Sequence, residues 1–150
     1  MVILLTFVQL LVIFHTYYSL SQRKELFDDR FGKNYTFAST GVSSFFLAMM
    51  LIFLIPGTSF MVIAAVIVGV LLGALFGSLY KMQTILLGIW NGGIGGLMGS
   101  MLGLVVLDPS LCGLPGTAAR DIANNIILFS IFGTIILFTT MWLVRFSLRV

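Results

Sequence analysis

Long apolar runs are the feature that most constrains the fold of this chain. Five runs of roughly 20 residues, the length that a helix needs to cross the hydrocarbon core of a bilayer, occupy residues 2–20, 37–55, 59–80, 84–107 and 122–144. Hydrophobic residues make up 59% of the sequence and charged residues only 9%, a composition that excludes a water-soluble domain of this size. The sequence therefore predicts an all-α integral membrane protein with about five transmembrane helices.

The breaks between the runs support helices and a single membrane domain. A transmembrane barrel would alternate apolar and polar residues, whereas these runs are continuous. Turn-forming residues separate them: Pro56-Gly57 follows the second run, and Asp108-Pro109 opens the longest break. We expect one domain over residues 1–150, with a cytoplasmic polar linker at 21–36 and an outer loop at 108–121.

The basic residues predict the orientation of the chain. The first run lacks the basic residues and the small-residue cleavage site of a signal peptide, so we interpret it as a retained anchor. With the N-terminus outside and the C-terminus in the cytoplasm, the positive-inside rule is satisfied by every lysine and arginine except Arg120. The alternative, a re-entrant second run, would reverse everything after it. The residues on the cytoplasmic side are Arg23, Lys24, Arg30, Lys33, Lys81, Arg145 and Arg149.

The segment 21–39 is the only extended polar part of the sequence. Phe27, Phe31 and Tyr35 recur every four residues, so a helix here would carry an aromatic edge beside its charges. We interpret the segment as a linker that touches the membrane surface. The alternative is a helix that docks a partner protein.

Glycine patterns single out the third and fourth runs. Small residues recur every four positions in one series of the third run and in two series of the fourth, and such spacing places them on one helix face. Because the connection at 80–83 is short, we expect these runs to form an antiparallel hairpin of the glycine-zipper kind. The helix-packing residues are Ala65, Gly69, Gly73 and Gly77, with Gly88, Gly92 and Gly96 and with Gly95, Gly99 and Gly103.

These glycine faces have three possible uses: they pack on each other, dock another subunit, or line a narrow path. Glycine costs roughly 1 kcal/mol relative to alanine in a helix, so glycines in a stable helix need a compensating contact. The fourth run has more glycines than contact with one other helix requires. Asn91 lies on the edge of this face with Met98 and Leu102. An unpaired amide is costly in hydrocarbon, so we expect Asn91 to clamp a neighbouring helix, or else to contact a solute together with Met98.

Chemistry-bearing residues are few. His15 and Cys112 are single residues of their kind, which predicts neither a metal site nor a catalytic site. The thioethers of Met98 and Met101 are three residues apart and suit Cu(I), but we interpret them as packing residues. No cofactor is expected, and the scattered basic residues imply no nucleic-acid partner.

The patterns favour a non-enzymatic protein in a membrane, which we take to be a bacterial plasma membrane. The first hypothesis is a non-catalytic subunit or assembly partner of a membrane complex, which contacts other membrane proteins or copies of itself through its glycine-rich helix faces. The alternative is an oligomeric transporter or channel that passes an ion, a metal ion or a small solute along a glycine-lined path. The runs carry no acidic or basic residue at membrane depth, which disfavours a proton-coupled carrier.

Overall fold

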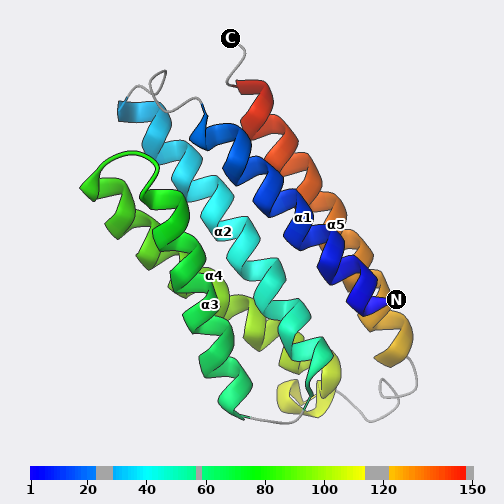
Figure 1. Ribbon diagram of the computed structural model, residues 1–150. Helices are drawn as coiled ribbons and strands as arrows, with labels where there is room; N and C mark the ends of the chain where they lie inside the picture. Colours follow the sequence, from blue (N-terminus) through cyan, green and yellow to red (C-terminus); the bar gives the residue numbers. More distant parts are fainter. Residues whose placement is uncertain (23–28, 57–58, 114–121, 148–150) are drawn as a thin grey trace.

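The computed structural model describes residues 1–22, 29–56, 59–113 and 122–147. Within these ranges the chain forms five α-helices and no strand (Figure 1). Each α-helix is long and apolar enough to cross a membrane, as the sequence predicts. They are α1 (Val2–Ser21), α2 (Asp29–Leu54), α3 (Ser59–Gly77), α4 (Met82–Leu107) and α5 (Ile122–Ser147), and the short 3-10 helix η2 (Pro109–Cys112) follows α4.

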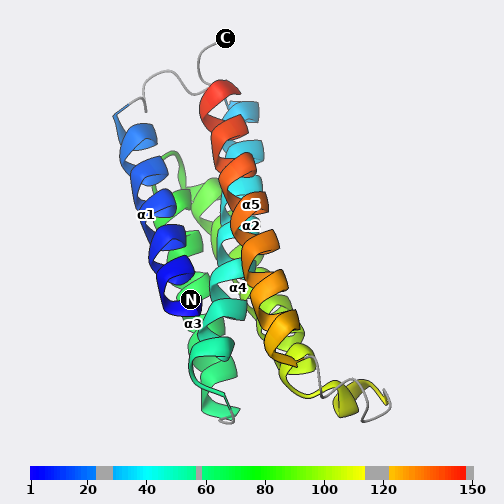
Figure 2. The ribbon, with the colours of Figure 1, turned by 90° about the vertical axis from the view of Figure 1, so that its right-hand side faces the viewer.

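Helix α2 occupies the middle of the bundle. Helices α3 and α4 lie on one side of it, and α1 and α5 lie on the other (Figures 1 and 2). It packs against all four of the other α-helices. Met49 and Met50 of α2 are fully buried, as is Leu137 of α5, so apolar side chains of α2 form the centre of the core.

The helix ends follow from local chemistry. Helix α2 ends at Leu54, just before Ile55-Pro56, because a proline disfavours helical geometry in the residue that precedes it. In the turn between α3 and α4, the Thr84 hydroxyl donates to the carbonyl of Gly77 over 2.9 Å and accepts from the amide of Lys81 over 3.0 Å. After α4, Gly113 adopts a φ of 71° and ends η2, a left-handed conformation that favours glycine.

Several predicted boundaries differ from the structure. Helix α3 ends at Gly77 rather than at Tyr80, and α2 begins at Asp29 rather than at Phe37. The second half of the expected linker at 21–36 is therefore the first part of a core helix, where Tyr35 is buried. The interpretation as a surface linker is wrong from residue 29 onward, and Phe27 lies outside the described residues.

Hydroxyl side chains explain how a polar segment becomes a core helix. Thr36 donates to the carbonyl of Gly32 over 2.8 Å, and Ser39 donates to that of Tyr35 over 2.7 Å. Both hydroxyls are thus satisfied within their own helix, which removes most of the cost of burying them in hydrocarbon. Hydropathy alone scores these residues as loop-like.

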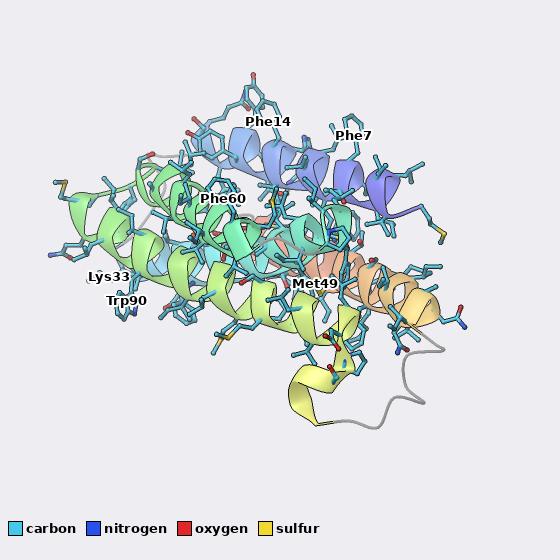
Figure 3. The ribbon with its side chains drawn as sticks, turned by 90° about the horizontal axis from the view of Figure 1, so that it is seen from below. Phe7, Phe14, Lys33, Met49, Phe60 and Trp90 are labelled. Carbon is cyan, nitrogen blue, oxygen red and sulfur yellow. The ribbon has the colours of Figure 1, made fainter. Side chains whose placement is uncertain are left out.

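The outside of the bundle is apolar. Phe7 and Phe14 extend from α1 away from the other helices, whereas Met49 lies between helices (Figure 3). Exposed phenylalanines of this kind would be costly in water but are favourable against lipid chains.

The described basic side chains lie at one end of the bundle. Lys33 is near the start of α2, Lys81 precedes α4, and Arg145 is in the last turn of α5, and these helix ends lie together (Figure 1). The opposite end holds η2 and the N-terminus. Four other basic residues lie outside the described residues: Arg23, Lys24, Arg120 and Arg149.

Candidate functional site: the glycine faces of α4

The first glycine series of α4 packs directly on α3. A Cβ atom added at Gly73 would overlap the carbonyl oxygen of Gly88, and one added at Gly69 would overlap that of Gly92. At Gly96 it would lie 3.0 Å from the carbonyl oxygen of Ala65. As the residue numbers rise along α3, those of the contacting residues on α4 decrease. The two helices are therefore antiparallel, and their backbones touch along the seam.

The second glycine series of α4 packs on α2. A Cβ atom at Gly99 would overlap the carbonyl oxygen of Phe45, and one at Gly103 would lie 3.0 Å from the Cβ atom of Ile52. Here partner numbers rise together, because α2 and α4 run in the same direction (Figure 1). The second series therefore packs on α2, whereas the first meets the backbone of α3.

Two seams account for the number of glycines in α4. Close backbone approach gives dispersion contacts and weak Cα–H···O hydrogen bonds, which take the place of the hydrophobic effect inside a bilayer. Of the three uses expected for the glycine faces, the structure has the first, packing within the chain. In the structure the faces are filled by α2 and α3.

The face of α2 that meets α4 is also built from small residues. A Cβ atom added at Gly88 would lie 3.3 Å from a methyl group of Thr36, and one at Gly92 would lie 3.2 Å from that of Thr40. Ser44 faces Gly95 in the same way. The sequence analysis missed this face, although Thr36, Thr40 and Ser44 recur every four residues, which is the spacing that marks small-residue helix contacts.

Asn91 links α4 to α2. Its Nδ2 atom donates to the carbonyl oxygen of Phe37 over 2.5 Å. Gly41 makes room for the amide, since a Cβ atom there would lie 2.8 Å from Nδ2. This contact is the interhelical clamp that was one of the two expectations for Asn91.

Met98 does not share the surroundings of Asn91. Its side chain is 58% exposed on the outside of α4, and Met101 is exposed too, whereas Leu102 packs against the core. The expected pairing of Asn91 and Met98 at a common surface is therefore wrong. After Asn91, the contacts of α4 with α2 continue at every fourth residue, through Gly95 and Gly99. Met98, seven residues after Asn91, therefore lies outside this contact.

A second polar contact, which was not predicted from the sequence, joins α1 to α5. Gln9 is fully buried, and its Nε2 atom donates to the Thr134 hydroxyl over 3.0 Å. Thr134 in turn donates to the carbonyl of Ser130 over 2.7 Å. The signal was a single glutamine inside the first apolar run, which calls for a partner just as Asn91 does.

The remaining candidates do not come together as a reactive site. No group of three or more histidine, cysteine or acidic residues lies close enough to hold a metal ion within the described part of the chain. His15 lies on α1 beside α5, and Cys112 ends η2 at the other end of the bundle. The side chains of Asn91 and Gln9 instead join helices.

Replacing Asn91 with leucine should weaken the bundle slightly. The variant loses the hydrogen bond to Phe37 while keeping a side chain of similar size, so we expect a loss of about 0.6 kcal/mol, the average for hydrogen bonds inside membranes. The free energy of unfolding in mixed detergent micelles measures this. Met98→Leu is the control and should change nothing, because its side chain is exposed. An equal loss in both variants would contradict the clamp.

No protein-family model matches the chain, and neither the curated proteins nor the solved structures contain a match to it.

Proposed function

We propose that the chain is a non-catalytic helical subunit or assembly partner of a membrane complex in a bacterial plasma membrane. In this proposal the five helices cross the bilayer with the N-terminus outside and the C-terminus in the cytoplasm. The charge distribution supports that orientation, since Lys33, Lys81 and Arg145 lie at one end of the bundle. The partners are other membrane proteins or further copies of this chain.

The observation that carries the proposal is the backbone contact along the two seams of α4. A Cβ atom at Gly73 or at Gly99 would overlap a neighbouring carbonyl oxygen, so no room for an ion or a water molecule exists between these backbones. This contact supports a glycine zipper that stiffens the chain itself. It argues against a glycine-lined path. Partner docking then uses faces other than the glycine faces.

Two amide side chains support the same proposal. Asn91 and Gln9, the residues that a polar solute would meet at membrane depth, donate to neighbouring helices instead. Polar groups used in this way fix how helices pack. A transport function would need a path elsewhere, such as one between copies of the chain.

Purification in mild detergent tests the proposal, together with flux measurements on the same preparation. We expect a stoichiometric partner, identified by mass spectrometry and recovered again when the partner carries the tag. Proteoliposomes of the purified chain should pass neither monovalent ions, Cu(I) nor small neutral solutes. Flux that Asn91→Leu alters in a normally assembled protein would contradict the proposal and favour the transporter.

A further inference from the structure

A small groove between α1 and α5 brings the side chains of His15 and Arg145 together near the basic end of the bundle. Its volume is about 60 Å³, and its lining includes His15 and Thr16 of α1 with Met141, Trp142 and Arg145 of α5. Thr16 and Met141 are buried and form the floor, whereas His15 and Trp142 are exposed at the rim. The groove is therefore apolar below and carries hydrogen-bond donors above.

Among the described residues, no acid balances the charge of this groove. Within the described ranges, neither Arg145 nor His15 forms an ion pair. The one carboxylate whose side chain is described, that of Asp108, lies at the opposite end of the bundle (Figure 1). An anion that enters the groove would meet a guanidinium group with free donors.

The donors suit a phosphate group. A guanidinium group can donate two parallel hydrogen bonds to phosphate oxygens. His15 donates through a ring N–H in its neutral form as well as in its charged form. The indole of Trp142 is typical of the headgroup level of a membrane, where its N–H group stays hydrated and its rings contact acyl chains.

The surroundings favour a lipid over a free anion. Phe138 lines the groove, stacks near Trp142 with ring centroids 6.1 Å apart, and is itself exposed. Together they form an apolar wall that leads from the headgroup level along α5 toward the middle of the helix. We propose that this groove binds the phosphodiester head of an anionic phospholipid, with Arg145 binding the phosphate and an acyl chain lying against Phe138. Basic pockets between transmembrane helices are known to bind anionic lipid heads in this way.

Lipid-dependent thermal stability of the full-length protein in nonionic detergent tests this. Phosphatidylglycerol should raise the melting temperature, because a ligand that binds only the folded state stabilises it. Phosphatidylcholine and inorganic phosphate at the same concentration should leave the melting temperature unchanged. A rise with inorganic phosphate equal to that with phosphatidylglycerol would overturn the lipid assignment, and no rise with any of them would overturn the site.

Matched variants separate the groove from general attraction between charges. Arg145→Gln should weaken the apparent affinity for phosphatidylglycerol about tenfold, as expected for the loss of a charge-assisted hydrogen-bonded contact. Arg145→Lys keeps the charge without the paired donors and should give an intermediate affinity. Lys33→Gln removes the same charge from an exposed residue at the same end of the bundle and should bind as the unmodified protein does. Equal weakening by Arg145→Gln and Lys33→Gln would overturn the proposal.

Discussion

Gly73→Ala should destabilise the bundle by about 1 to 3 kcal/mol, the usual cost of overpacking a close contact. The added methyl group would overlap the carbonyl oxygen of Gly88, which belongs to the backbone of α4 and has no rotamer to change. The helices must therefore move apart along the whole seam. Gly73→Ile and Gly92→Ile should cost more, since both insert a branched side chain at backbone contacts. The midpoint and free energy of unfolding in mixed micelles measure the loss.

Gly93→Ala is the matched control for Gly73→Ala. Gly93 lies in the same bundle, but its added Cβ atom would lie 3.4 Å from a methyl group of Val70, an ordinary packing distance. Alanine is also the better helix former, by roughly 1 kcal/mol in water. We expect Gly93→Ala to be neutral or slightly stabilising. If Gly73→Ala behaves like Gly93→Ala, the α3–α4 seam is not a close contact in the membrane.

The helices and the glycine faces could be predicted from the sequence because lipid imposes simple rules. A run of apolar residues of the right length must be helical, and a spacing of four places Gly69 and Gly73 on one face. The register of this face against Gly88 and Gly92 follows from the short turn before α4. These features are local, so they can be read from the chain.

The packing of α2 against α4 could not be predicted, because it depends on the tertiary arrangement. Thr36 and Thr40 belong to a segment whose mean hydropathy is lowered by hydroxyl groups. The cost of burying such a group falls only when it forms a hydrogen bond within the helix, as that of Thr36 does. The exposure of Met98 was also hidden, because a residue seven positions after Asn91 lies on the same side of an isolated helix. Only the crossing of α2 and α4 decides that Asn91, and not Met98, contacts α2.

Cysteine labelling should give opposite results at the two ends of α4. Met82 begins the helix and is 82% exposed, while Cys112 ends η2 beyond its other end. Helix α4 has 26 residues, which at 1.5 Å per residue gives about 39 Å, enough to cross a bilayer. If the basic end faces the cytoplasm, an impermeant maleimide will label Cys112 in intact cells. Met82→Cys in a Cys112→Ser background will react only after permeabilisation.

The same pair of labelling sites distinguishes the alternatives for the fold in the membrane. Permeabilised cells give the full signal for each thiol, which separates protection by the membrane from burial in the protein. Equal labelling of both residues in intact cells would mean that α4 does not cross. The reversed pattern, with an N-terminal tag still accessible from outside, would mean that α2 is re-entrant, because every later helix then changes direction. The reversed pattern with a protected tag would invert the whole chain and place Arg145 outside, against the positive-inside rule.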